Sequence, residues 1–247
     1  MSLVPLRFLL ATGMAVMAMS ASAEPTHLMI RALSEDAKFI GDHTGGVEIT
    51  LRDRTTHRVL SQGMIHGGTG DTDRIMKAPK TRGATLSDAQ TAGFDAVIDI
   101  ARPTLVEVEA HGPLGRPDAV ITVRSAMWVM PGQAIIGDGW VLKFSGLLIT
   151  PNLTRAADGS ARLDATVTMM CGCPISPGGL WDEANYRIEA DVLDRGAVVH
   201  HVRLHYAGQP SQFSAELPRQ TGRHRTIRIV AVQSNAPNTG VVDLPIR

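Results

Sequence analysis

The stretch "YRIEADVLDRGAVVHHVRLHYAGQPSQFSAELP", Tyr186 to Pro218, alternates apolar and polar residues. In each of its three runs one parity is apolar: Tyr186, Ile188, Ala190 and Val192, then Val202, Leu204 and Tyr206, then Phe213, Ala215 and Leu217. Successive side chains of a β-strand point to opposite faces, so a period of two predicts strands with one buried face. Gly and Pro residues separate the runs, and the stretch therefore predicts short strands joined by turns.

The same alternation recurs along most of the chain. It covers residues 47–51, 94–100, 106–110, 163–171 and 227–231. Gly, Pro, Asn or Asp bounds each run, and no long stretch keeps a helical period. Many short strands at this spacing predict an all-β protein built from sandwiches.

Length and strand rhythm together predict two consecutive antiparallel β-sandwich domains. The rhythm is interrupted by "SAMWVMPGQAIIGDG", Ser125 to Gly139, which contains one Pro and several Gly residues. A boundary there gives an N-terminal domain over residues 24–125 and a C-terminal domain over residues 126–247. Both lengths are typical of β-sandwich domains.

Two stretches resemble known modules. "GVEITLRDRTTHRVLSQG", Gly46 to Gly63, looks like the strand-turn-strand of transthyretin-like and immunoglobulin-like modules in exported bacterial proteins. The stretch from Tyr186 to Pro218 is similar to the paired strands of an immunoglobulin-like domain. The resemblance implies a fold and says nothing about activity.

The first 23 residues, "MSLVPLRFLLATGMAVMAMSASA", have the features of a secretory signal peptide. Arg7 is followed by a short apolar run and by the small-residue exit Ala21-Ser22-Ala23. The apolar run is shorter than the roughly 20 residues that a membrane-spanning helix needs. We therefore expect an exported mature chain that begins near Glu24 and is not inserted in the membrane, and that is periplasmic in a Gram-negative host.

The charge balance and the missing motifs argue against two classes of protein, nucleic-acid-binding proteins and serine hydrolases. Without Arg7, 23 of the 24 basic residues remain against 24 acidic ones, and no basic stripe is present, so we expect no nucleic-acid partner. The chain lacks the G-x-S-x-G elbow of serine hydrolases. We expect a binding or accessory protein rather than an enzyme, with another exported protein as its partner; the sequence leaves the oligomeric state open.

The most informative motif is "TMMCGCPISPGG", Thr168 to Gly179, which contains both cysteines of the chain. If the preceding strand continues, Met169 and Cys171 belong to its core-facing row and Met170 points away. Gly172 permits a sharp bend, and the Pro and Gly residues that follow end the strand. We therefore expect Cys171 and Cys173 at a junction between a strand and a loop.

Three interpretations of this motif compete. The thiols could serve packing alone or form a local disulfide, whose small ring would add little stability. They could bind a soft metal ion, above all Cu(I), through Cys171 and Cys173 with Met169 or Met170; zinc, with a histidine such as His205 from a neighbouring strand, fits the spacing less well. They could instead exchange disulfides with a client protein, although no thioredoxin-like Cys-x-x-Cys is present.

Overall fold

The computed structural model describes residues 25–218 and 225–246, and within them it is all-β and sandwich-like. The predicted fold class is confirmed. The strands are β1 (Thr26–Ser34), β2 (Val47–Asp53), β3 (Val59–Ile65), β4 (Phe94–Ile98), β5 (Thr104–Gly112), β6 (Ile121–Val129), β7 (Ala134–Phe144), β8 (Leu147–Arg155), β9 (Ala161–Met169), β10 (Tyr186–Asp194), β11 (Ala197–Tyr206), β12 (Gln212–Leu217), β13 (Arg225–Gln233) and β14 (Thr239–Ile246). Short helical turns are η1 (Asp42–Thr44), η2 (Asp73–Lys77), η3 (Pro117–Ala119) and η4 (Glu183–Asn185).

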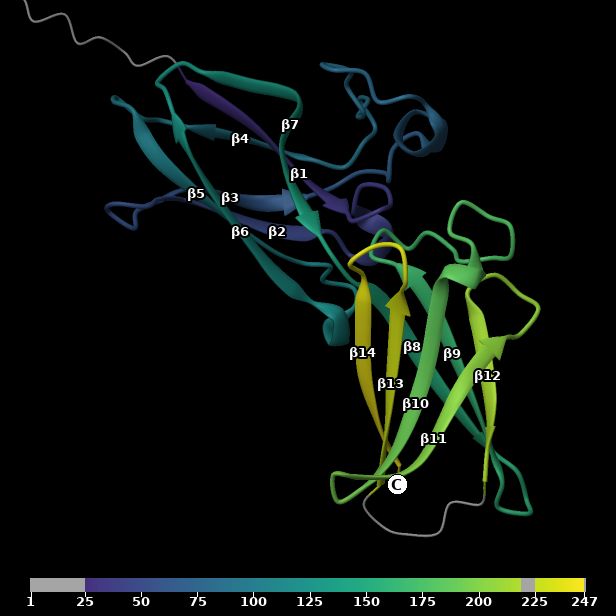
Figure 1. Cartoon of the computed structure of the whole chain (residues 1–247). Helices are drawn as coiled ribbons and strands as arrows, with labels where there is room; N and C mark the ends of the chain where they lie inside the picture. The colour runs from purple at the N-terminus through teal and green to yellow at the C-terminus, as the bar shows by residue number, and fades with distance from the viewer. Residues whose placement is uncertain (1–24, 219–224, 247) are drawn as a thin grey trace, which may run out of the picture.

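Strands β1 to β7 form an N-terminal β unit (Figure 1). One sheet has the order β4-β1-β7 and the other the order β3-β2-β5-β6. All pairs are antiparallel except β1 and β7, which run parallel from the pair His27 and Ala134 to the pair Ser34 and Phe144. The alternating residues of these strands close over one buried cluster, which includes Leu28, Ile30, Ile49, Val106 and Val108.

The strand pairing does not divide at residues 125 and 126, where we expected the domain boundary. Strand β6 runs through that point, and Pro131 and Gly132 lie in the turn that joins β6 to β7. Strand β7 then pairs with β1 and completes the N-terminal unit. The Gly and Pro residues at the expected boundary therefore mark a turn between the two sheets of the N-terminal unit and an irregular strand, and the chain enters the second unit between Phe144 and Leu147.

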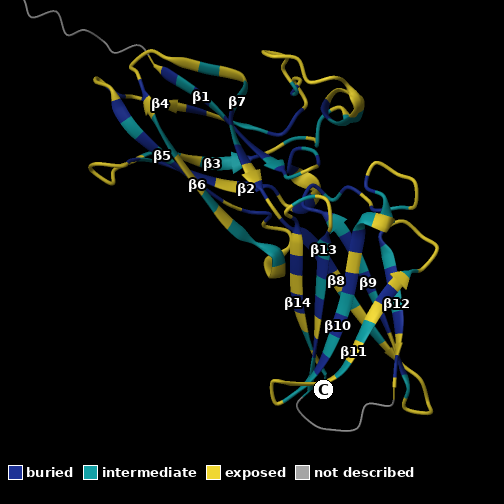
Figure 2. Ribbon diagram, in the orientation of Figure 1, coloured by how far each residue is buried: buried dark blue, intermediate teal, exposed yellow. Residues whose placement is uncertain are grey.

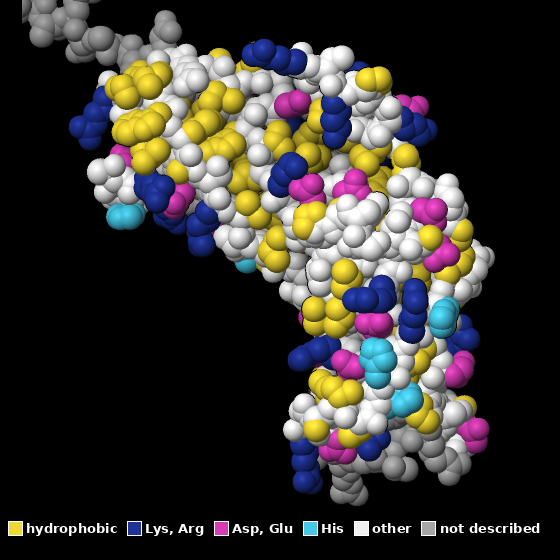
Figure 3. Space-filling view, viewed as in Figure 1, with side chains coloured by type: hydrophobic (Ala, Val, Ile, Leu, Met, Phe, Trp, Pro, Cys, Tyr) yellow, Lys and Arg dark blue, Asp and Glu magenta, His cyan; other side chains and the backbone are white. Residues whose placement is uncertain are grey.

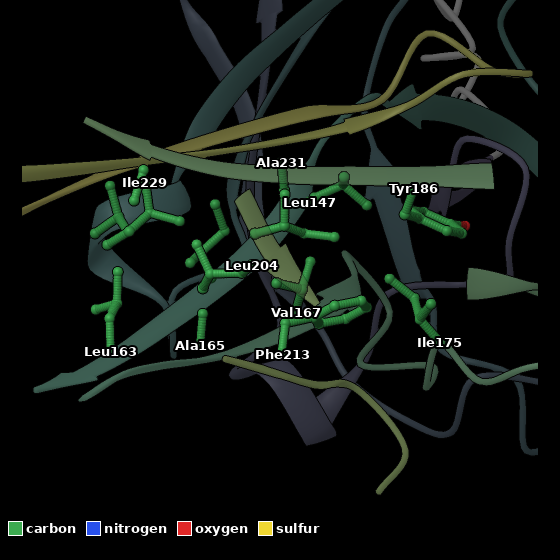
Figure 4. Close-up of a cluster of buried hydrophobic side chains, with 14 of the residues drawn as sticks. Leu147, Leu163, Ala165, Val167, Ile175, Tyr186, Leu204, Phe213, Ile229 and Ala231 are labelled. Atoms are coloured by element: carbon green, nitrogen blue, oxygen red, sulfur yellow. The ribbon is translucent and has the colours of Figure 1, made fainter. Parts of the chain in front are cut away.

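Strands β8 to β14 form the C-terminal β unit, a single sheet with the order β14-β13-β10-β11-β12-β9-β8. All its pairs are antiparallel, and β14 comes back against β8, so the sheet curls around one core. Along β9 and β10, buried residues alternate with residues that are mostly partly buried (Figure 2). The core contains the predicted apolar row of β9 and Tyr186 of β10 (Figure 4).

The expected signal peptide, residues 1–23, lies outside the residues that the structure describes. Among those that it does describe, no helix has the length and apolar character needed to cross a membrane.

Candidate functional site

The Cys171-Gly172-Cys173 turn reverses the chain directly after β9. The N–H of Gly172 donates a hydrogen bond to the carbonyl of Met169 (2.8 Å), and the N–H of Met169 donates to the carbonyl of Cys173 (3.1 Å). Gly172 has a φ of 79°, a left-handed conformation that glycine adopts without the strain other residues incur. The sharp bend predicted at Gly172 is present, and Met169 and Cys173 face each other across it.

The arm that leaves the turn is fixed to the start of β12. The N–H of Ile175 donates to the hydroxyl of Ser211 (3.1 Å), and the N–H of Ser211 donates to the carbonyl of Ile175 (2.7 Å). Both residues are buried, with exposed fractions of 0% and 4%. The turn is therefore held at both arms inside the C-terminal unit.

The two cysteines are joined by a disulfide, with Cα atoms 5.5 Å apart. Cys171 is 1% exposed and Cys173 5% exposed, and both belong to the core cluster of the C-terminal unit. Met169, which is fully buried, belongs to the same cluster. The predicted core-facing row thus ends in Met169 and Cys171, and Cys173, beyond the bend, joins the same cluster.

The Met169 thioether has a specific partner. The hydroxyl of Tyr186 donates a hydrogen bond to its Sδ atom (3.2 Å). Burial raises the pKa of the Tyr186 phenol, and the nearby charge of Asp36 raises it further. The phenol therefore stays neutral and keeps its proton for this bond throughout the ordinary pH range.

Met170 points away from the cysteines, as its opposite parity predicts, and the structure places it in the other unit. It is buried in the core cluster of the N-terminal unit, with its side chain against Gly146 at the crossing between units. Met169 and Met170 therefore cannot be treated as equivalent donors, because only Met169 shares a core with the cysteines.

His205 is not brought to the cysteines. It alternates with buried Leu204 on β11 and is exposed on the outer face of the sheet, where it pairs with Ser214 of β12. Histidine side chains are visible on this outer surface among charges of both signs (Figure 3). The cysteines lie on the inner side of the same sheet, so our sequence-based suggestion of His205 as a ligand has no support in this arrangement.

Sequence reasoning missed His43. This residue of η1 belongs to the N-terminal unit, yet its imidazole covers Gly172: a Cβ added to Gly172 would lie 2.8 Å from its Nε2 atom and 3.3 Å from Cγ2 of Thr44. His43 itself is exposed to solvent on its other side. No local pattern links a polar turn near residue 43 to a cysteine motif so far along the chain.

The chemistry of this site depends on the oxidation state of its sulfur atoms. Oxidised, the pair is a local disulfide. Reduced, it offers two thiols in the same buried cluster as the Met169 thioether, and sulfur donors favour soft ions such as Cu(I). Over the described ranges, no three His, Cys, Asp or Glu side chains are grouped so as to hold a metal ion. The further sulfur donor in the same core cluster is the thioether of Met169.

Comparison with known proteins assigns no family. The sequence matches no protein-family model and no curated protein. Among solved structures, a DUF3823 family protein from Bacteroides ovatus is 8% identical, with a TM-score of 0.30 over 91% of this chain and 100% of that one. An exo-chitosanase from Amycolatopsis orientalis is 13% identical, with a TM-score of 0.26 over 91% of this chain and 24% of that one. A β-glucuronidase from Parabacteroides merdae is 10% identical, with a TM-score of 0.23 over 90% of this chain and 24% of that one. These TM-scores are too low to identify a family or an activity.

Proposed function

We propose that this chain is an exported accessory protein, periplasmic in a Gram-negative host, whose reduced Cys171-Gly172-Cys173 turn binds one Cu(I) ion. The observation that carries the proposal is the common location of three sulfur side chains, Met169, Cys171 and Cys173, in one buried cluster at one turn. The backbones of Met169 and Cys173 are paired across the turn by a hydrogen bond.

The donor set favours Cu(I) over other ions. Thiolate and thioether ligands select soft ions, whereas carboxylate, carbonyl and water oxygens suit hard ones. The surrounding core is apolar, so water has little access to a bound ion. Structural zinc takes four ligands, usually Cys and His, and the histidine we considered for it, His205, lies on the outer face of the sheet.

The disulfide favours a second candidate function, thiol-disulfide exchange with another exported protein. Cys171 and Cys173 are bonded to each other and enclose a very small ring, the kind of disulfide that is easily reduced. In such an exchange a partner dithiol gives two electrons and two protons to this pair and becomes a disulfide itself. The cysteines are nearly buried, so a partner must displace part of the cover over Gly172 to reach them.

Competitive titration of the reduced full chain against a Cu(I) chelator tests the copper proposal. We expect one tightly bound Cu(I) in the parent, none in the double variant C171A/C173A, and weaker binding in M169L. Alanine is chosen because the cysteines lie in an apolar core, where a serine hydroxyl would be left without a partner. M170L and H205A are the matched controls and should bind like the parent. Equal Cu(I) binding by C171A/C173A and the parent would refute the proposal, whereas binding by neither, with disulfide exchange intact, would favour the second function.

A further inference from the structure

The cysteine turn also contacts the N-terminal unit. We call the linker and all the noncovalent contacts between the two β units the joint. Only one covalent segment, Ser145-Gly146, connects β7 to β8 and therefore the two units (Figure 1). Everything else that joins them is noncovalent, so their relative position depends on side-chain and turn contacts.

One set of contacts is made by Glu35 and Asp36, in the turn that directly follows β1. The indole N–H of Trp181 donates to the carbonyl of Asp36 (2.8 Å), and the side-chain amide of Gln233 donates to the carboxylate of Asp36 (2.6 Å). The amide of Asn238 donates to the carbonyl of Glu35 (3.0 Å) and accepts a hydrogen bond from the N–H of Gly146 (2.8 Å). The turn is thus held by three residues of the C-terminal unit, and Asn238 also fixes the linker.

The second set is centred on the cysteines. His43 and Thr44 of the N-terminal unit lie against Gly172, with no room for a methyl group between them. Met170, next to Cys171, is buried in the N-terminal core, while Ala37 of the N-terminal unit is buried in the C-terminal core. The two cores therefore exchange side chains across the joint, directly beside the disulfide.

We propose that the redox state of the Cys171–Cys173 pair controls how firmly the two β units are joined. Reduction by a dithiol adds two electrons and two protons and replaces the S–S bond by two thiols in van der Waals contact, which need more space than bonded sulfurs. At Gly172, between the two cysteines, the turn has little room, because His43 and Thr44 pack against it and the C-terminal core packs the cysteines. Close-packed interiors transmit such strain instead of absorbing it. We therefore expect the contacts between the two units to loosen before the C-terminal core does. This inference depends on the disulfide and its packing and goes beyond the copper proposal.

Residue-resolved amide hydrogen exchange on the oxidised and the dithiol-reduced full chain tests the inference. The reporter is the N–H of Gly146, whose hydrogen bond to Asn238 lies in the joint; the control is the N–H of Ile188 in the centre of the C-terminal sheet. We expect reduction to speed exchange at Gly146 about fivefold, which corresponds to roughly 1 kcal/mol, and to leave Ile188 unchanged.

A variant separates the joint from the sulfur chemistry. W181F replaces the indole by a smaller aromatic ring and removes the donor to Asp36, so its oxidised form should already exchange at Gly146 like the reduced parent. Equal Gly146 exchange in the oxidised and reduced parent, with two free thiols confirmed by titration, would overturn the inference. So would faster exchange at Ile188 by the same factor, because the change would then be a global loss of stability. Neither result bears on Cu(I) binding, which the chelator titration measures separately.

Discussion

Substituting Gly172 by alanine should destabilise the protein more than its backbone conformation alone would require. A residue other than glycine in the left-handed region costs roughly 1–2 kcal/mol. The added methyl group would also press against the ring of His43 and the methyl of Thr44, and overpacking of this kind typically costs about 1–3 kcal/mol. Because His43 is exposed and can rotate, we expect a total loss of about 2–4 kcal/mol in the free energy of unfolding.

Two matched variants isolate the packing contribution. Gly178, in the loop that follows, also has a positive φ of 64°, but a Cβ added there meets nothing within 4 Å, so G178A should lose only about 1–2 kcal/mol. The double variant H43A/G172A should recover about 1 kcal/mol relative to the sum of its single variants. Urea unfolding followed by circular dichroism measures the stability of G172A, G178A, H43A and H43A/G172A, and an unchanged slope m shows that the variants can be compared. If G172A and G178A lose the same free energy, the packing of His43 on the cysteine turn is not as described.

Two further predictions concern buried and charged contacts. S211A removes the acceptor for the buried N–H of Ile175, so we expect a loss of roughly 1–3 kcal/mol in the same urea assay; no change would mean that this hydrogen bond does not hold the exit arm of the turn. The second prediction concerns the pKa of the Asp138 carboxyl. Burial raises this pKa, but the hydrogen bonds that Leu86 and Ser87 donate and the charge of Arg31 outweigh burial and hold it below its usual value. Its carboxylate therefore stabilises the folded state above about pH 4, and that stabilisation is lost as the pH falls through the lower folded-state pKa. D138N should be about 1 kcal/mol less stable than the parent at pH 7, with the difference shrinking in acid; a pH-independent difference would contradict the assigned role.

The alternation of apolar residues was sufficient to predict many of the strands and the directions of Met169, Met170 and Cys171. Met169 and Cys171 lie on the inward row and Met170 on the other, as parity requires. This works because the side chains of a strand alternate strictly, so one buried residue fixes the rest of the row.

What the pattern could not predict depends on contacts between distant segments. Strand β7 contains Gly137 and Gly139 and lies beyond the expected domain boundary, yet it pairs in parallel with β1 of the N-terminal unit. A side chain at Gly139 would collide with the backbone of Met29, so the glycine there reflects a close approach between strands and not a break. His43 escaped notice for the same reason: its role depends on the joint between units, which no local pattern encodes.

The sulfur ligands of bound copper can be counted directly. X-ray absorption at the copper edge of the reduced full chain, loaded with one equivalent of Cu(I), reports which atoms surround the metal. The proposed site predicts a shell of three sulfur atoms, from Cys171, Cys173 and Met169, and a shell of two in M169L. A shell of nitrogen or oxygen atoms, or a sulfur count unchanged in M169L, would contradict it.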